Sequence, residues 1–413
     1  MQLLNTFSAH KHHLFKASLL FVAILAFATV ASASEGVFLL GNDAQQLGRA
    51  SSGVASPRSA YWSYLNPATM TDLERRIDIN FYSVFTDIEL KPRGPLGNWI
   101  DGDQKGDGFY EIFSGGMIWP LEDGVLGGGL YIPSGTGVEY PHSRNIISRI
   151  FGNNDRRLNY QHIRLVLAYA KELGDGWSLG FGLHGSVSRF QTDHITLKLR
   201  CAEFDNEWDE ALGAGFGIGI YKKWERWAFG LVYNSRHWTQ SMDEYDDLLK
   251  SPLDTPHVVQ AGVAYKLTPK IELTADLKYL NWEDVVTYGA HLVPDSGFTW
   301  SDQYGYKLGI EWTASEKLTL MAGFSHTNTP IDEDHVFLSG LVPVAVEDHV
   351  TAGFTYRINE KHEIHLVGIH GIKNDLQETG KGLREGDILS PLGVGTELLS
   401  NGESFVLGYS YKF

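Results

Sequence analysis

The chain has 413 residues, of which 43% are hydrophobic, 12% aromatic and 20% charged, and its formal net charge is −16. This acidic excess argues against a nucleic-acid partner, because DNA and RNA are bound through basic surfaces. A mean hydropathy of −0.18 and the presence of only one long apolar run exclude a protein with several spanning helices. The 45 glycines, with 19 tyrosines, 21 phenylalanines and 11 tryptophans, suit an all-β protein with many turns.

The first 33 residues have the pattern of a secretory signal peptide. Lys11 and Lys16 provide the positive region, residues 19–28 the apolar region, and residues 31–33 a small-residue cleavage site before Ser34. The apolar run is shorter than the roughly 20 residues of a spanning helix, although a signal anchor is the alternative. We therefore expect export of the chain. Cys201 is the only cysteine, so no intrachain disulfide is expected.

From about residue 75 to residue 413, apolar and polar residues alternate in segments of roughly ten. Leu165 and Leu167, for example, lie on the face opposite to Arg164, because successive residues of a strand point to opposite sides. Fourteen such segments are predicted: 75–90, 109–119, 124–138, 158–171, 176–190, 211–222, 226–239, 256–267, 270–285, 302–314, 317–328, 347–358, 361–373 and 402–413.

The connections between these segments alternate strictly between short and long. A soluble β-sandwich gives the same alternation of residues, but it has no reason to gather its long loops at one end. A transmembrane barrel has short periplasmic turns and longer external loops. The last segment ends in alternating aromatic residues, with Tyr409, Tyr411 and the terminal Phe413. The sequence therefore predicts an all-β, transmembrane antiparallel β-barrel of about 14 strands in the bacterial outer membrane, closed so that no sheet edge meets lipid.

Residues 34–74 precede the first strand and lack its alternation, although their composition is not that of a disordered segment. A barrel of fourteen strands has a lumen too wide for its own side chains to fill, since the diameter grows with the number of strands. Many inward positions are also small, among them Gly180, Gly182 and Gly219. We therefore expect residues 34–74 to form an N-terminal hatch that plugs the lumen; without a plug the barrel is an open pore.

Two motifs of the hatch carry a family resemblance. Leu47, Gly48, Arg49 and Ala50, followed by Ser52-Gly53 and then by Asn66, Pro67 and Ala68, resemble the hatch of the FadL/TodX family of outer-membrane hydrophobic-compound transporters. Residues 131–135 after the Pro120 turn, and residues 175–182, resemble the barrel of that family. The resemblance covers the whole mature chain. It implies a monomeric barrel, plugged by its N-terminus, that admits long-chain fatty acids or aromatic and aliphatic hydrocarbons. No cofactor is expected.

The resemblance also implies roles for particular residues. Val37, Phe38 and Leu39 match the N-terminus that touches ligand in these transporters; packing within the plug is the alternative role. Pro133, Gly135 and Gly137 fall in a strand where proline removes a ladder hydrogen bond and glycine permits a bend. We expect a kink that opens the wall for lateral exit of the ligand, and a bulge at the outer rim is the alternative.

Other chemistry is disfavoured by the sequence. His362 and His365 would lie on opposite faces of a strand, so no metal site is predicted. The acidic run 243–247 is interpreted as solvated loop charge rather than a Ca²⁺ site that bridges lipopolysaccharide. Inward charges such as Arg164, Lys278, Lys307 and Arg357 either meet a ligand carboxylate or pair structurally, and structural pairing is the favoured expectation. Outer-membrane lipid and lipopolysaccharide are the expected surroundings. A porin for polar solutes and, less favoured, an outer-membrane phospholipase remain alternatives to a transporter that is not an enzyme.

Overall fold

The computed structural model describes residues 35–97, 103–106, 108–140, 156–193, 207–245, 249–292 and 297–413. The predicted signal peptide, Ser34 and Cys201 lie outside these residues. In the described part of the chain, no helix is both long enough and apolar enough to cross a membrane.

One antiparallel sheet of sixteen strands closes on itself, because the last strand pairs with the first. Two of the strands, β2 (Gln104–Lys105) and β9 (Trp238–Thr239), have two residues each, which leaves the fourteen long strands of a closed barrel. The long strands are β1 (Arg76–Lys91), β3 (Gly108–Leu121), β4 (Gly124–Tyr140), β5 (Arg156–Gly174), β6 (Trp177–Asp193), β7 (Asp209–Lys223), β8 (Trp227–Asn234), β10 (Val258–Thr268), β11 (Ile271–Leu280), β12 (Gln303–Thr313), β13 (Leu318–Thr327), β14 (Asp348–Arg357), β15 (His362–Gln377) and β16 (Glu397–Lys412).

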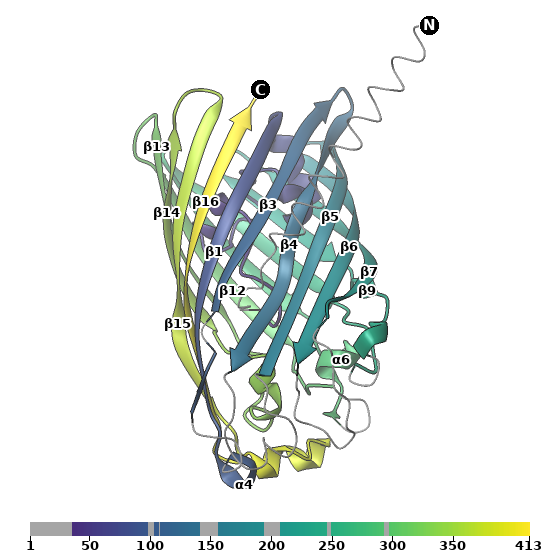
Figure 1. Cartoon of the computed structure of the whole chain (residues 1–413). Helices are drawn as coiled ribbons and strands as arrows, with labels where there is room; N and C mark the ends of the chain where they lie inside the picture. The colour runs from purple at the N-terminus through teal and green to yellow at the C-terminus, as the bar shows by residue number, and fades with distance from the viewer. Residues whose placement is uncertain are drawn as a thin grey trace, which may run out of the picture.

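Short turns and long connections lie at opposite ends of the barrel (Figure 1). The short turns and the C-terminus are at the top of that view, and the long connections are at the bottom. The described parts of the long connections contain six short helices: α4 (Gly94–Gly97), η2 (Asp243–Tyr245), α6 (Val286–Gly289), η3 (Leu338–Leu341), η4 (Gly382–Glu385) and η5 (Ser390–Leu392). The predicted alternation of short and long links, and the barrel it indicated, are confirmed.

The outer surface of the barrel is apolar. In β5, Leu165 and Leu167 are 58% and 62% exposed, whereas the intervening Val166 is 2% exposed and faces inward. The same alternation recurs in the other strands, apart from residues 131–138 of β4, so an apolar belt faces outward from the barrel. Such a belt is what a bilayer requires, because lipid offers no partner to polar side chains.

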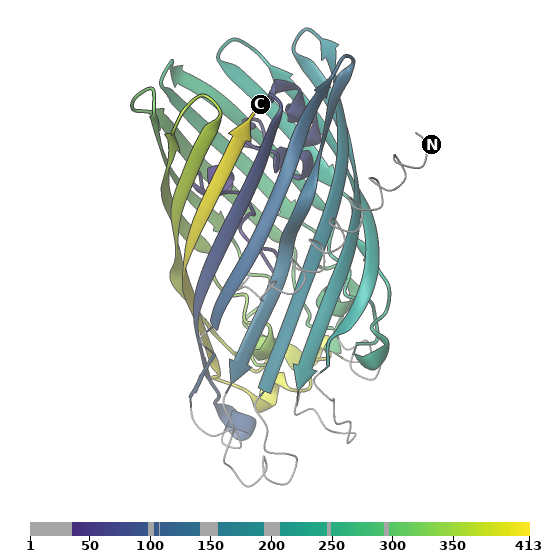
Figure 2. The ribbon, with the colours of Figure 1, turned by 45° about the horizontal axis from the view of Figure 1, so that its top comes forward.

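The N-terminal segment lies inside the barrel. Figure 2 shows it within the ring of strands, nearer to the end with the short turns. It contains three short helices, α2 (Ala44–Leu47), α3 (Trp62–Leu65) and η1 (Pro67–Asp72). Almost all of its side chains are buried against the inward faces of the strands. We call residues 35–74 the hatch.

Three predicted strand ends differ most from the structure. The segment predicted over 226–239 ends as β8 at Asn234, and the segment predicted over 270–285 ends as β11 at Leu280. Beyond these points the chain turns into long connections that pack on one another, and that packing overrides local alternation. The last strand begins at Glu397 instead of 402, because residues 397–400 pair with both β1 and β15 although they lack apolar–polar alternation.

Candidate functional site

Arg58 fixes the middle of the hatch to the part of the wall formed by β11 and β12. Its guanidinium donates to Glu272 on β11 at 2.7 Å and to Glu311 on β12 at 3.0 Å. These carboxylates are 14% and 16% exposed, so the ion pairs are shielded from solvent. Ser56 also donates to Glu272. Glu272 and Glu311 thus pair with the hatch, whereas the inward Asp78 pairs with Arg76 of its own strand.

Glu35 fixes the start of the hatch to the same wall. It lies between Lys278 on β11 and Lys307 on β12, and the distance from Lys307 Nζ to Glu35 Oε1 is 2.6 Å. Burial alone would raise the pKa of Glu35, but the two lysines lower it to about 2. The carboxylate is therefore ionised at neutral pH, and the pairs are electrostatically strong in this shielded site.

The motif of Leu47, Gly48, Arg49 and Ala50 forms a turn against β13 and β14. Leu47 ends α2, and Gly48 packs against Met321 so closely that a Cβ atom would clash. Arg49 donates to Ser56 Oγ at 2.8 Å, and the Ala50 amide donates to Thr351 Oγ1 at 3.0 Å. Every residue of the motif is buried, so each has a packing role within the hatch.

The motif of Asn66, Pro67 and Ala68 contacts the opposite wall. Asn66 Nδ2 donates to Val54 O at 3.0 Å, and Asn66 Oδ1 accepts from the Ala68 amide at 3.2 Å, which caps η1. Glycines of the wall make room for this turn: a Cβ on Gly219 would clash with Asn66 Oδ1, and one on Gly180 would clash with the Ala68 nitrogen. The small inward residues of β6 and β7 therefore seat the hatch.

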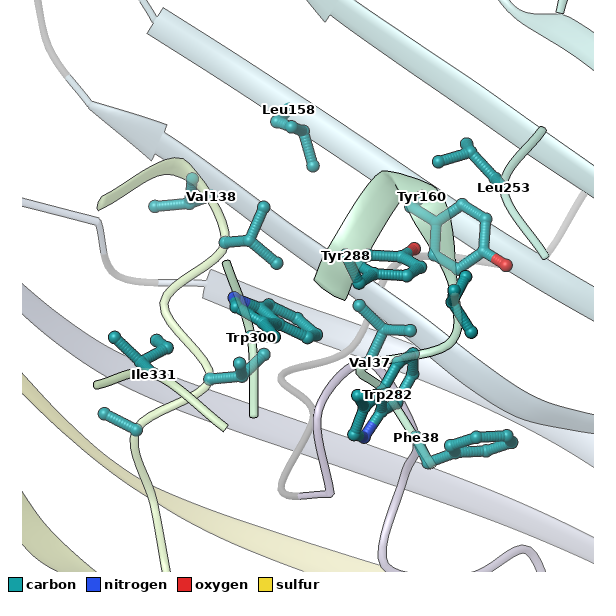
Figure 3. Packing of buried hydrophobic residues seen from close by; sticks show 14 of the residues in the cluster. Val37, Phe38, Val138, Leu158, Tyr160, Leu253, Trp282, Tyr288, Trp300 and Ile331 are labelled. Carbon is teal, nitrogen blue, oxygen red and sulfur yellow. The ribbon is translucent and has the colours of Figure 1, made fainter. Parts of the chain in front are cut away.

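An apolar cluster fills the lumen at the end with the long connections (Figure 3). Val37 and Phe38 of the hatch pack there with residues of the long connections, and the Phe38 and Trp282 ring centroids are 5.7 Å apart. Trp282 also lies edge-on to Tyr288 and Trp300, at 5.0 and 5.3 Å. The cluster further includes Val138, Leu158, Tyr160, Leu253 and Ile331. Apolar side chains thus continue from the external connections to the hatch.

Leu39 lies in a second apolar cluster, beside the wall at β4. Its partners there include Leu40, Ile112 and Ile132, with Leu130 packed against them. Together with Val37 and Phe38 in the first cluster, Leu39 places the three predicted ligand-contacting residues at the junction of the two clusters.

The wall is interrupted between β3 and β4. The ladder that joins them runs from Leu121–Gly124 to Gly115–Leu130 and stops there. Residues 108–114 of β3 and 131–138 of β4, which we call the unpaired stretch, have no strand pairing with each other. The β4–β5 register shifts between Tyr131 and Ser134, around Pro133.

Both faces of β4 are buried in the unpaired stretch. The side chains of residues 131–138, including Ile132 at 2% exposure and Val138 at 1%, are buried on successive positions. A strand in a complete barrel wall shows one outward face, as β5 does at Leu165. Gly135 and Gly137 lie in this displaced part, after Pro133. The sequence thus points to the position at which the ordinary wall geometry is lost.

A polar chamber with three histidines occupies another part of the lumen. His162 Nδ1 is 2.8 Å from Ser188 Oγ, and Arg164 donates to His162 Nε2 at 3.1 Å. Because the arginine leaves only the Nδ1 position for the imidazole proton, His162 cannot accept a proton from Ser188. This arrangement is unlike the base of a hydrolase, which a carboxylate orients. In the described ranges, no cluster of three or more His, Cys, Asp or Glu residues is placed to hold a metal.

Two long connections are joined by His335. Its Nε2 lies 2.9 Å from Glu385 Oε2 and its Nδ1 lies 3.2 Å from the buried Asp387. Burial alone would lower the pKa of His335, but the hydrogen bonds to Asp387 and Glu385 raise it to about 9. His335 is therefore protonated at neutral pH, and it holds the covering of the apolar cluster in place.

Several residues of the site were not predicted. No sequence motif marks these residues, which are Glu35, Asn42, Tyr110 and the aromatic residues of the 281–300 connection. The aromatic content of that connection could have predicted a buried position, because large aromatic side chains are seldom fully exposed to water. The connection contains Trp282, Tyr288, Phe298 and Trp300. Of the inward cations, Arg164 bonds to Tyr64 of the hatch at 3.0 Å.

These features define the chain as a plugged β-barrel of the bacterial outer membrane. Residues 24–413 match the family described as outer membrane protein transport protein (OMPP1/FadL/TodX), and the chain belongs to that family. The family resemblance, the localisation and the transport function expected from the sequence are thereby confirmed. A search of curated proteins finds no match.

Solved structures share the fold over the full barrel. A Pseudomonas aeruginosa FadL homologue is 14% identical with a TM-score of 0.67, covering 92% of this chain and 100% of its own. The Pseudomonas putida toluene transporter TodX is 16% identical with a TM-score of 0.66, covering 91% and 99%. The Ralstonia pickettii toluene transporter TbuX is 12% identical with a TM-score of 0.64, covering 91% and 99%. At these identities the likeness is one of fold.

Proposed function

We propose that this outer-membrane transport protein takes up hydrophobic molecules, either long-chain fatty acids or hydrocarbons, and releases them sideways into the bilayer. The toluene transporters TodX and TbuX share its fold. The observation that carries the proposal is the position of hatch residues 37–39, which join the external apolar cluster to the unpaired stretch of the wall. One hatch segment, residues 37–39, therefore connects the site of ligand capture with the site of lateral exit.

Capture takes place in the external apolar cluster. A ligand that replaces Trp282–Phe38 and neighbouring contacts there removes its own apolar surface from water, which contributes about 25 cal/mol per Å². Val37 and Phe38 contact the ligand from the hatch side, and Leu39 meets it beside β4. The salt-bridged and hydrogen-bonded hatch below the cluster disfavours axial passage of an apolar molecule, because polar groups would lose their partners.

Exit takes place at the unpaired stretch. An apolar ligand that left the lumen axially would return to water and lose the burial it had gained. Passage between β3 and β4 avoids that loss, since Ile112, Ile132 and Leu130 line the stretch and lipid lies outside. Pro133, Gly135 and Gly137 give β4 the shape that this passage needs. The remaining motifs, from Leu47 to Ala50 and from Asn66 to Ala68, hold the hatch while residues 37–39 move.

A disulfide across Phe38 and Ser134 tests the proposal. These residues form a narrow antiparallel pair, in which the Cα atoms of a non-hydrogen-bonded pair lie about 4.5 Å apart, within the range that a disulfide accepts. In a Cys201→Ser background, Phe38→Cys with Ser134→Cys locks the hatch onto β4. We expect uptake of a labelled long-chain fatty acid or of toluene to stop in the oxidised protein and to return on reduction.

Binding of the same probe to the oxidised protein is the companion measurement, because capture from outside needs no movement of β4. Each single-cysteine variant, treated with the same oxidant, is the control for damage by oxidation. Uptake that continues in the oxidised double variant would show that the ligand leaves by another route. Loss of probe binding even in the reduced double variant, which has no disulfide, would show that Phe38 acts in capture.

A further inference from the structure

Displacement of β4 leaves some of its backbone groups without their usual strand partner. In the unpaired stretch, β3 no longer accepts from or donates to the side of β4 that faces it. Pro133 falls on this side, where its missing N–H costs no ladder bond. A buried backbone group without a partner costs free energy comparable to a lost hydrogen bond, and lipid supplies no replacement. Something else must therefore bond these groups.

Four such groups of β4 have partners that do not come from a strand ladder. The hatch supplies three of them: Val37 O accepts from the Gly135 amide at 2.8 Å, and the Leu39 amide donates to Pro133 O at 2.9 Å. Asn42 Oδ1 accepts from the Ile132 amide at 2.6 Å. The fourth partner is the Tyr110 hydroxyl of β3, which donates to Gly137 O at 3.0 Å. The hatch and one side chain thus replace the missing ladder.

Asn42 connects both edges of the unpaired stretch. Its side chain bonds β4 at Ile132, and its main-chain oxygen accepts from Ser114 Oγ of β3 at 2.5 Å. Asn42 is 2% exposed, yet its amide nitrogen has no hydrogen-bond partner. Its closed position is therefore only half satisfied, unlike that of Asn66, whose oxygen and nitrogen are both bonded.

Tyr110 and Asn42 differ from the other two contacts in how they can be broken. Both bond β4 through a side chain, and a side chain rotates between staggered positions without movement of either strand. The contacts of Val37 and Leu39 are backbone pairs, and they separate only when the hatch segment itself moves. Ile112 of β3 and Ile132 of β4 lie in one apolar cluster with Leu39.

We infer that Asn42 and Tyr110 are the gating residues of the wall, and that their side-chain hydrogen bonds to β4 hold the unpaired stretch closed until a ligand passes between Ile112 and Ile132. The inference rests on the lateral exit proposed above and assigns its regulation to two residues. Neither residue belongs to the external apolar cluster, and Tyr110 packs against the second cluster, which contains Leu39 and Ile112.

A reporter cysteine at Ile112 measures opening of the gate directly. Ile112 is 1% exposed in the closed wall, so in an Ile112→Cys, Cys201→Ser background N-ethylmaleimide reacts only when the stretch opens. Loss of one hydrogen bond should raise the labelling rate roughly twofold to tenfold. We expect this increase for Tyr110→Phe and for Asn42→Leu, each in folded barrels selected by heat-modifiable migration.

Tyr169→Phe is the matched control. The Tyr169 hydroxyl also donates to a backbone carbonyl, that of Asp123, but at the turn that joins β3 to β4, away from the unpaired stretch. Its removal should leave the labelling rate unchanged. Equal labelling rates in Tyr110→Phe, Asn42→Leu and the reporter parent would overturn the inference.

The labelling test does not depend on transport. Faster labelling together with normal uptake in the oxidised Phe38–Ser134 variant would leave the gate standing and refute lateral exit. Unchanged labelling together with blocked uptake in that oxidised variant would leave lateral exit standing and refute the role of Asn42 and Tyr110.

Discussion

The hatch meets two regions of wall in different ways. Against β6, β7 and β8 the wall ladders run without a register shift, and glycines such as Gly180 and Gly219 give the Asn66 turn a seat. Against β3 and β4 the ladder stops, and hatch residues 37–42 supply hydrogen bonds that a neighbouring strand would otherwise make. The hatch thus fills the lumen beside the complete wall, and it replaces missing strand hydrogen bonds at the incomplete wall. The hydrogen bonds at β4 can break and re-form only if the packing against β6 and β7 keeps the rest of the hatch in place.

The largest effect is expected from Glu35→Gln, which acts on the hatch segment at the incomplete wall. The change leaves Lys278 and the buried Lys307 without their carboxylate, and breaking a buried pair costs about 3–5 kcal/mol. Amide hydrogen exchange of residues 37–39 should become roughly 100-fold faster or more. The control is Glu74→Gln, since Glu74 is 61% exposed, Lys412 keeps Glu363 as a second partner, and a pair of this kind contributes about 1 kcal/mol or less. Exchange that stays slow in Glu35→Gln would remove the ion pairs from this role.

Gly219→Ala acts on the complete wall. The added methyl group would meet Asn66 Oδ1, and overpacking of this kind costs about 1–3 kcal/mol. We expect urea unfolding from lipid vesicles to require less denaturant by that free energy. Gly185→Ala on β6 is the matched control, because a Cβ there meets no atom within 4 Å. A similar loss of stability in both variants would mean that strand propensity, and not the hatch, sets the effect.

Asn66→Ala separates anchoring from wall packing. Loss of the cap on η1 and of the bond to Val54 O should destabilise the hatch by about 1–2 kcal/mol. Exchange of the amides around residues 54–70 should accelerate and uptake should fall, while the barrel stays heat-modifiable. Normal uptake of hydrophobic probes by this variant would contradict the anchoring role.

The smallest effect is expected for the external connections, far from both walls. His335 has its pKa raised to about 9 by Asp387 and Glu385, so its contribution is complete below its ordinary value of 6.5 and is lost as pH rises through about 9. Subtilisin should therefore cut the connection 378–396 faster at about pH 10 than at about pH 7. In His335→Gln this pH-dependent increase should be absent once the protease's own pH profile is subtracted, and its persistence would assign the change to another group.

The barrel could be predicted from the sequence because the alternation of apolar and polar residues in each strand shows which residues face lipid and which face the lumen. Leu165 and Leu167 face lipid and Arg164 faces the lumen, so alternation is visible within five residues and needs no knowledge of the neighbours. The hatch motifs around Arg49 and Asn66 could also be located, and Pro133 indicated where β4 would depart from an ordinary strand. Strand ends such as Leu280 and Glu397 could not, because pairing with distant strands and packing of the connections decide them.

The sequence by itself therefore determined the class of fold, the count of long strands and the position of the proline and glycines in β4, since these follow from local period and backbone chemistry. Only the tertiary structure decided which residues complete the wall. Asn42 and Tyr110 lie 68 residues apart in the chain, and each bonds a backbone group of β4 that is free only because β3 has separated from it. Such a hydrogen bond forms only because a backbone group of β4 lacks its strand partner. The sequence around Asn42 or Tyr110 therefore cannot predict it.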